Sequence, residues 1–315
     1  MEKRFNFRIY PTKEQEIKIQ KNFGCVRYVY NYYLRARIEN YQNGQGIMSL
    51  SECCRDLTTL KQKEGHEWLS EADSNSLRYA LSDLDDAYMA FFTKARSGTE
   101  PFGFPNYKKK RETRQSYRSK NHIQRQSIKV LDGQIKLPKL GYVECRVSKQ
   151  IEGRILSATV IQAPSGKYFV SVCCTEYTPQ PLPKTGAEIE IKAGTQGLAV
   201  ISDGLDGRQH EGARPFDKAQ KKLTRLQREM LRKPKGSNNR EKARIKLARA
   251  FEKAANQKKD YLHKLTTQMV REYDVITIPA TAQSRNTGWS EFAAQLEYKC
   301  NWYGKELIKT NANSA

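Results

Sequence analysis

Residues 4–15 read RFNFRIYPTKEQ, and this stretch contains the change from strand to helix that decides how the fold begins. Phe5, Phe7 and Ile9 alternate with polar residues, which is the pattern of a strand with one buried face. Thr12 and Gln15 have the spacing of a capping box, in which two side chains satisfy free amides at a helix start. The sequence therefore predicts an N-terminal strand that is followed at once by a helix.

Outward from this stretch, the hydrophobic period is helical up to about residue 96 and changes to two beyond it. Asp132-Gly133 is a strong hairpin signal within the second region. Strand-like runs occupy residues 127–131, 134–137, 142–147, 154–163 and 167–176. We therefore predict a β-barrel, residues 1–11 and 97–178, that is interrupted by a helical module, residues 12–96.

Residues 179–185 contain three prolines and predict a stiff linker. Beyond it, short strand patterns are followed by a helical hairpin at 218–264, a buried strand at 275–278 and an amphipathic helix from about 291 to 308. A β-β-β-α-β order is the opening of a ribonuclease-H-like sheet. The predicted fold class is therefore α+β with several domains, the last of them an α/β domain at residues 186–315.

The charge of the chain indicates its partners. The 315 residues include 56 Lys and Arg against 34 Asp and Glu, a formal net charge of +22. Such a charge repels itself unless a polyanion binds, and nucleic acid is the polyanion that we expect. Within residues 218–264 alone, 17 basic residues face 4 acidic ones, so the acids cannot neutralise that hairpin.

Other features exclude several classes of protein. No apolar run is long enough to span a membrane, and residues 1–10 lack the apolar core of a secretory signal. None of the seven cysteines has C-x-x-C spacing, so we expect neither a disulfide framework nor a zinc ribbon. We expect a cytoplasmic protein, associated with the nucleoid when it is bound to its target. Trp68, Trp289 and Trp302 are expected to pack in cores.

Several segments together resemble one family. They are GCVRYVYNYYL at 24–34, GFPNYKKKR at 103–111, IKLPKLGYV at 135–143, YLHKLTTQMVREYD at 261–274 and LEYKCNWYGKEL at 296–307. In this order they resemble TnpB, the transposon-encoded RNA-guided DNA nuclease related to type V CRISPR effectors. The resemblance implies that the barrel is a wedge domain, the helical insert a recognition module and residues 186–315 a RuvC nuclease domain.

The RuvC segment departs from the family pattern at its metal-binding acids. Lys192 stands where the resemblance implies the first Asp, and Pro279 where it implies a Glu. The third acid, beyond a zinc ribbon, has no counterpart before Ala315, so we expect a C-terminally truncated RuvC domain. Two-metal cleavage needs clustered carboxylates, whereas Lys has no acceptor and Pro no side-chain ligand. We therefore expect no catalytic residue, no bound Mg or Zn and no enzyme activity.

Two alternatives stay open at this point. Glu188 and Glu190, with Glu272 and Asp274 near the second strand, are substitute acids for a residual Mg-dependent RNA-guided nuclease. Lys192 either supplies the charge of the missing metal or reflects neutral drift.

The resemblance also implies nucleic-acid contacts at matching positions, with guide RNA as the bound nucleic acid. The expected readers of a short motif beside the target in double-stranded DNA are Ser74, Asn75, Arg78, Ser119, Lys120, Asn121 and His122. The expected contacts to guide RNA or its heteroduplex are Arg4, Arg8, Arg27, Asn31, Tyr32, Lys108, Lys109, Lys110, Arg111, Arg114, Tyr117, Arg118, Lys136, Lys139, Lys221, Lys222, Arg225 and His263. His263 could equally pack within the hairpin.

These expectations describe an RNA-guided, sequence-specific DNA-binding protein without nuclease activity. Bound beside a promoter, one protein with one guide RNA would act as a transcriptional repressor. Within the TnpB family, the chain resembles the nuclease-dead repressors called TldR.

Overall fold

The computed structural model describes residues 2–98, 103–110, 114–176, 178–193, 199–202, 209–210, 214–280 and 288–310. The chain divides into two compact units, Met1–Tyr177 and Thr178–Ala315. Each unit has its own sheet and its own buried core, and each is described by itself below.

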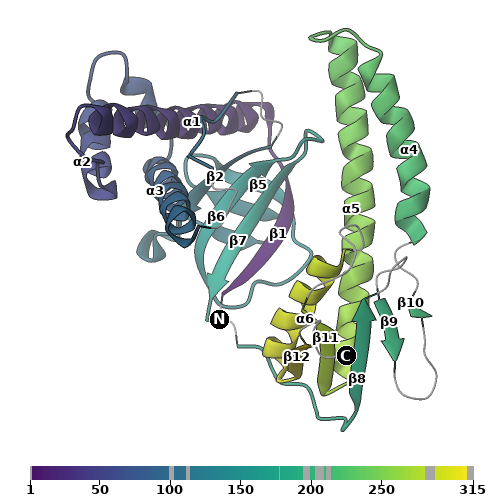
Figure 1. Ribbon diagram of the computed structural model, residues 1–315. Helices are drawn as coiled ribbons and strands as arrows, with labels where there is room; N and C mark the ends of the chain where they lie inside the picture. Colours follow the sequence, from purple (N-terminus) through teal and green to yellow (C-terminus); the bar gives the residue numbers. More distant parts are fainter. Residues whose placement is uncertain are drawn as a thin grey trace. The chain divides into compact units, whose positions relative to one another are not determined.

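The first unit is built on a seven-stranded sheet in the order β2-β6-β7-β1-β5-β4-β3 (Figure 1). Its strands are β1 (Lys3–Tyr10), β2 (Gln115–Lys120), β3 (Lys129–Leu131), β4 (Gln134–Leu137), β5 (Gly141–Arg146), β6 (Arg154–Gln162) and β7 (Tyr168–Thr175). Every described pairing between these strands is antiparallel. Phe5, Phe7 and Ile9 are buried, as the alternation predicted, and β3 and β4 meet at the predicted Asp132-Gly133 hairpin.

The sheet is open in the described part of the chain, because its edge strands β2 and β3 are not paired with each other. The closed β-barrel that we predicted is not found there. The side-chain amide of Asn121, just after β2, forms hydrogen bonds to two backbone groups. Its Oδ1 accepts from the Ile128 amide, just before β3, at 2.9 Å. Its Nδ2 donates to the Ile155 carbonyl at 3.0 Å. The chain therefore turns from β2 towards β3 without the two strands pairing.

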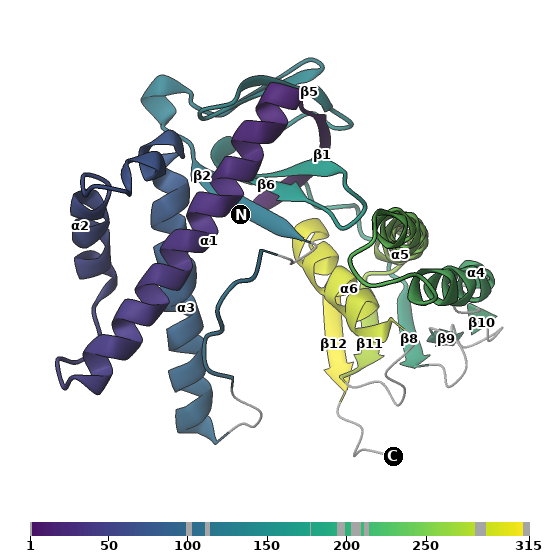
Figure 2. The same ribbon diagram turned by 90° about the horizontal axis from the view of Figure 1, so that it is seen from above.

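Three helices complete the first unit: α1 (Lys13–Gln42), α2 (Leu50–Leu60) and α3 (Ser74–Ser97), with a short 3₁₀ turn at Glu67–Glu71. The capping box of Thr12 and Gln15 is present at the start of α1, as predicted. Helix α1 crosses α3 (Figure 2), and both helices contact β2. Their apolar residues join those of the sheet in one core cluster, so the helices do not form a core of their own.

The second unit contains a five-stranded sheet in the order β10-β9-β8-β11-β12. Its strands are β8 (Glu188–Ala193), β9 (Ala199–Ser202), β10 (Gln209–His210), β11 (Val275–Pro279) and β12 (Glu306–Thr310). Strands β8, β11 and β12 are parallel, whereas β9 and β10 pair antiparallel. Helix α5 (Asn238–Glu272) and α6 (Trp289–Tyr303) cover the face that carries Ile191 and Ile276.

Helix α4 (Arg214–Leu231) pairs with α5 in the predicted hairpin, which breaks near Pro234 and stands out from the five-stranded sheet (Figure 1). The hairpin has a small core around Leu223, Leu226 and Leu247. Its basic residues therefore lie on a scaffold whose apolar side is already occupied.

The predicted C-terminal helix is too long. Helix α6 ends at Tyr303, and Gly304 has a φ of 69°, a left-handed conformation that favours glycine. Residues 306–310 form β12 instead, parallel to β11. The half-buried Leu307 fits a helical spacing and a strand face equally well, so the sequence pattern could not separate the two.

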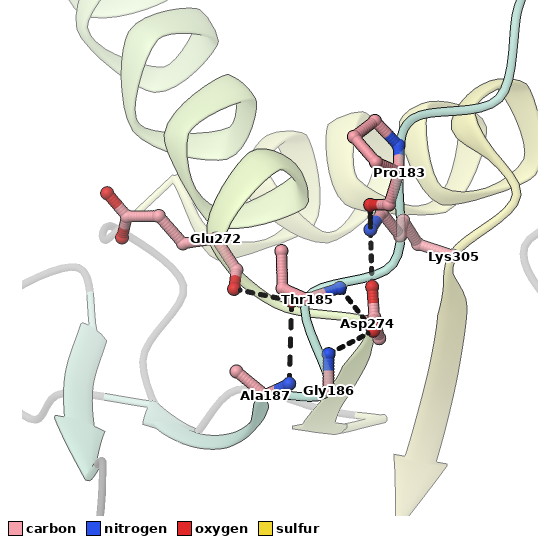
Figure 3. Close-up of polar contacts among 7 residues, drawn as sticks. All are labelled: Pro183, Thr185, Gly186, Ala187, Glu272, Asp274 and Lys305. Carbon is pink, nitrogen blue, oxygen red and sulfur yellow. Dashed lines mark hydrogen bonds and ion pairs between the residues drawn. The ribbon is translucent and has the colours of Figure 1, made fainter.

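The proline-rich linker is attached to the second unit rather than acting as a free spacer (Figure 3). The Asp274 carboxylate accepts from the amides of Thr185 and Gly186 at 2.8 and 2.6 Å. It also accepts from the ammonium of Lys305, which donates in addition to the Pro183 carbonyl. Lys305 first, and then the Gly186 amide, hold the pKa of Asp274 at about 2, below its ordinary 3.8. One carboxylate thus joins the linker to the starts of β11 and β12.

All seven cysteines are free thiols. Within the described residues, no helix combines the length and apolarity that crossing a bilayer requires.

We predict that Asn121→Ala lowers the free energy of unfolding by about 1–3 kcal/mol, because it leaves the Ile128 amide and the Ile155 carbonyl without their partner. Urea-induced unfolding measures the change. Lys120→Ala, at the exposed neighbouring position, is the matched control and should change stability by less than about 0.5 kcal/mol. Equal effects of the two variants would contradict the bridging role of Asn121.

A second prediction concerns how the contribution of Asp274 to stability changes at acidic pH. A carboxyl whose pKa is lowered on folding stabilises the fold above its ordinary pKa, and that contribution disappears as the pH falls through its folded value. The stability difference between the wild type and Asp274→Asn should therefore be constant above about pH 4 and shrink towards pH 2. Urea unfolding followed by Trp289 and Trp302, in a Trp68→Phe background, reports on the second unit. Glu272→Gln is the control, because its side chain points away from the cluster (Figure 3). A stability difference between the wild type and Asp274→Asn that does not vary with pH would refute the lowered pKa of Asp274.

Candidate nucleic-acid interface

The start of α3 and the end of β2 bring together residues that were predicted to read DNA. The Asn75 side-chain amide lies 3.0 Å from His122 Nε2, which joins the two elements directly. Ser74, Arg78 and Lys120 are exposed around this contact. The two separate sequence segments therefore form one polar surface.

Two members of the predicted motif-reading set are structural instead. Ser119 is buried, 1% exposed, and its hydroxyl donates to Asp73 at 2.8 Å. Asn121 uses both atoms of its amide within the sheet, as described above. Neither side chain is free to contact a base, because a base contact would break hydrogen bonds that order the fold.

Positive charge is concentrated beside this junction. Burial lowers the pKa of Lys61, and the nearby charges of Arg78 and Lys139 lower it further, against the opposing effect of Asp73. Three cations that repel one another in this way gain from a bound anion such as a phosphate. Lys61 did not emerge from the sequence, since only the fold brings it next to Arg78.

The basic segment after the PFGFPNY turn is fixed onto α1. Asn31 donates to the Lys108 carbonyl at 2.9 Å and accepts from its amide at 2.8 Å. The Lys108 ammonium lies over the Tyr30 ring, 4.0 Å from its centroid. Asn31 is thus a positioning residue rather than the RNA contact that we predicted, whereas Lys109 and Lys110 are exposed. Arg111 lies outside the described residues.

The other predicted contacts of the first unit divide by exposure. Tyr117 is 3% exposed and packs edge-on against Phe23, so little of its surface is available for the predicted nucleic-acid contact. Arg118 is half-buried, over the Tyr79 ring at 3.9 Å and paired with Asp83 at 3.1 Å. The remaining positions are exposed or half-buried at the surface: Arg4, Arg8, Arg27, Tyr32, Arg114, Lys136 and Lys139.

Helix α4 carries an exposed basic stripe. Lys221, Arg225, Arg228 and Arg232 follow one face of the helix at spacings of four, three and four residues, which brings them side by side. The sequence analysis named Lys221, Lys222 and Arg225 but missed the last two, which the same spacing would have revealed. We refer to these four residues as the α4 stripe.

His263 is half-buried between α5 and α6. Its Nδ1 lies 3.4 Å from the Tyr298 hydroxyl, and its carbonyl accepts from the Lys299 ammonium at 2.8 Å. It therefore contributes to the packing of the two helices, the second of the two readings that the sequence left open.

The parallel pairing of β8 and β11 decides the geometry of the segments in which we expected the metal-binding acids. Glu188 pairs with Val275 and Glu190 with Thr277. Because both strands advance together, two further residues bring the backbone of Lys192 beside that of Pro279. The side chain of Lys192 lies outside the described part. Within the described residues, no group of three or more His, Cys, Asp or Glu side chains could hold a metal ion.

Two family models match parts of the chain. Residues 1–46 match a model described as a helix-turn-helix domain, and residues 171–280 match one described as "Probable transposase". In the structure, residues 3–42 form a strand and one continuous helix of 30 residues, without the turn that separates two helices.

Relatives resemble the chain over nearly its whole length. A protein of Streptomyces pristinaespiralis, described as "Putative RNA-guided DNA endonuclease", is 35% identical over 96% of this chain and 76% of its own length. InsQ of Escherichia coli K12, with the same description, is 30% identical over 96% of this chain and 79% of its own. Among solved structures, the Cas12f1–sgRNA–target DNA complex matches 99% of this chain and 90% of its own with a TM-score of 0.65 at 11% identity, which shows a shared fold. The chain therefore belongs to the TnpB (IS605 OrfB) family.

Proposed function

We propose that this protein uses a guide RNA to bind DNA of matching sequence, that it does not cut this DNA, and that it represses transcription by remaining bound. The descriptions of its relatives as RNA-guided DNA endonucleases support the guide and the DNA target. The observation that supports the loss of cleavage is the register of β8 and β11, which pairs Glu190 with Thr277 and, continued by two residues, brings the backbone of Lys192 beside that of Pro279.

The residues at this position do not suit a divalent metal. Mg²⁺ takes oxygen ligands, and a pair of ions that act together needs carboxylates able to hold them about 4 Å apart. Lysine contributes a positive charge and no acceptor, and proline contributes no side-chain ligand. The adjacency of these two residues also supports the assignment of Lys192 and Pro279 to the family's acid positions, because paired ligands must come from neighbouring strands.

The acids that could substitute are poorly located. Asp274 precedes Pro279 by five residues of extended chain, about 16 Å, and its carboxylate is already bound by Lys305 and two amides. Glu272 is farther still, at the end of α5, and Glu188 pairs with Val275 at the same distant end of the sheet. Of the four acids considered, Glu190, beside Thr277, lies nearest to the Pro279 end. One carboxylate from this set is too few for the alternative function, a residual nuclease.

In this proposal, two exposed basic surfaces hold the nucleic acid. The α4 stripe and Lys109–Lys110 offer cations to phosphates, which adds affinity without reading sequence. In this proposal, pairing with the guide reads the target, while Arg78 and Lys120 face the adjacent motif, where an Arg can donate two hydrogen bonds to a guanine. A complex that binds tightly and does not cut would obstruct RNA polymerase at a promoter.

We predict that the purified protein carries RNA, and that this RNA directs binding to a matching duplex without cleaving it in Mg²⁺. Sequencing of the co-purified RNA identifies the guide, and gel-shift and cleavage assays on one labelled duplex test both halves of the statement. Glu190→Gln is the matched variant, because it removes the one of the four candidate acids that lies nearest to Pro279, and it should leave binding unchanged. Guide-dependent cleavage by the wild type, especially if Glu190→Gln abolishes it, would establish the nuclease instead. Absence of bound RNA would contradict the proposal as a whole.

A further prediction concerns the α4 stripe. Exchanging Arg225 and Arg228 together for Gln should weaken guided binding and lower the slope of log K against log salt by about 2, since each phosphate contact to duplex DNA contributes about 0.9. Lys233→Gln is the control, because Lys233 lies 3.9 Å from Glu229 and is partly neutralised. An unchanged slope in the double variant would exclude the stripe from the interface.

A further inference from the structure

A groove of about 720 Å³ follows one face of α1 in the first unit. Its floor comes from α1 residues between Gly24 and Glu39, a length of about 22 Å along the helix. Trp68 and Tyr107 line it as well, from the segments before and after α3. The sequence analysis expected Trp68 in a core, yet its side chain is 39% exposed, and Tyr107 is 48% exposed.

Aromatic rings form a continuous set along this groove. Tyr28 and Tyr32 are stacked with centroids 5.9 Å apart, and Trp68 meets Tyr28 edge-on at 5.1 Å. The polar atoms of two of these rings have partners inside the protein: the Tyr28 hydroxyl lies 2.8 Å from His66 Nε2, and the Trp68 indole donates to the Gly65 carbonyl at 3.0 Å. The exposed part of the Trp68 ring therefore offers π-surface rather than an unmet hydrogen bond.

The Tyr107 side of the groove is held in place without a ligand. The two hydrogen bonds between Asn31 and the backbone of Lys108 attach the chain directly after Tyr107 to the floor. A ligand that enters the groove does not need to order this segment, which lowers the entropic cost of binding.

The charges of the groove favour an anion. Arg27 and Arg35 line it with one acid, Glu39, which is paired with Arg35 at 2.6 Å. A second hollow shares Gly24 and Arg27 with the first and adds Lys110, so the groove continues towards the start of α1. Cations of α1 thus lie along the same groove as the exposed rings of Trp68 and Tyr107, and this combination suits a strand with phosphates on one side and free bases on the other.

We propose that the α1 groove binds unpaired nucleotides of the guide RNA by stacking their bases on Trp68 and Tyr107, while Arg27 contacts the phosphates. The inference rests on the proposed function and adds to it the kind of RNA element that the first unit takes. A duplex is a poor occupant, because its bases are already stacked and paired. The displaced DNA strand is present only after target pairing, whereas a guide RNA covers these exposed rings throughout the life of the complex.

The test uses the full chain, freed of co-purified nucleic acid, with a twelve-nucleotide oligouridylate, its deoxy counterpart and a twelve-base-pair RNA duplex as probes. Trp68→Ala and Tyr107→Ala should each weaken oligouridylate binding about fivefold to 150-fold without changing its salt slope, because stacking releases no counterions. Trp68→Phe should retain most of the affinity. Arg27→Gln should lower the slope by about 0.7. Oligouridylate should quench wild-type tryptophan fluorescence, and this quenching should disappear in Trp68→Phe.

Tyr41→Ala is the control, at a side chain 68% exposed on the same helix but outside the groove, and it should bind like the wild type. The inference would be overturned if Tyr41→Ala lost as much oligouridylate affinity as the ring variants, or if both ring variants bound oligouridylate like the wild type. It would also be overturned if the ring variants lost as much affinity for the RNA duplex as for oligouridylate. Tighter binding and stronger quenching by the deoxy oligomer would assign the groove to the displaced DNA strand and overturn the RNA assignment. None of these probes involves a guide or a target, so a failure here is distinguishable from a failure of guided DNA binding.

Discussion

The parallel register of β8 against β11 is the constraint on which the functional interpretation depends. Backbone pairing leaves no freedom in which residue stands beside which, and a shift of one residue would turn every side chain to the other face. The buried residues Ile191 and Ile276 prevent such a shift, since moving them would expose the core beneath α5 and α6. The same register, continued by two residues, brings the backbones of Lys192 and Pro279 together for a reason unrelated to catalysis.

Charge provides the second constraint. A chain with a formal charge of +22 repels itself. The structure separates the cations that serve the fold from those that face solvent. Lys305 is buried against Asp274, and Lys108 lies over Tyr30, whereas the α4 stripe projects from a hairpin whose core is already filled. In the proposed function, the exposed cations of the α4 stripe bind polyphosphate strands.

Much of the local structure follows from short-range physics and could be predicted. The capping box of Thr12 and Gln15, the Asp132-Gly133 turn and the strand with Phe5 and Phe7 each depend on residues within a few positions. The misassigned segments depend on distant partners. Residues 306–310 continue a helical pattern in sequence, yet they pair with β11, which offers a free parallel edge. The predicted barrel does not close in the described part of the chain, and Asn121, which we expected to contact a base, instead hydrogen-bonds to the backbone of Ile128 and Ile155.

The sequence by itself determined the excess of positive charge and most of the strands and helices, because composition and periodicity are properties of the chain alone. Only the tertiary structure decided which polar side chains are available to a ligand. Ser119, Asn31 and Tyr117 are occupied or buried, and Trp68 and Tyr107 line one groove, because burial and hydrogen bonding depend on residues that are tens of positions away.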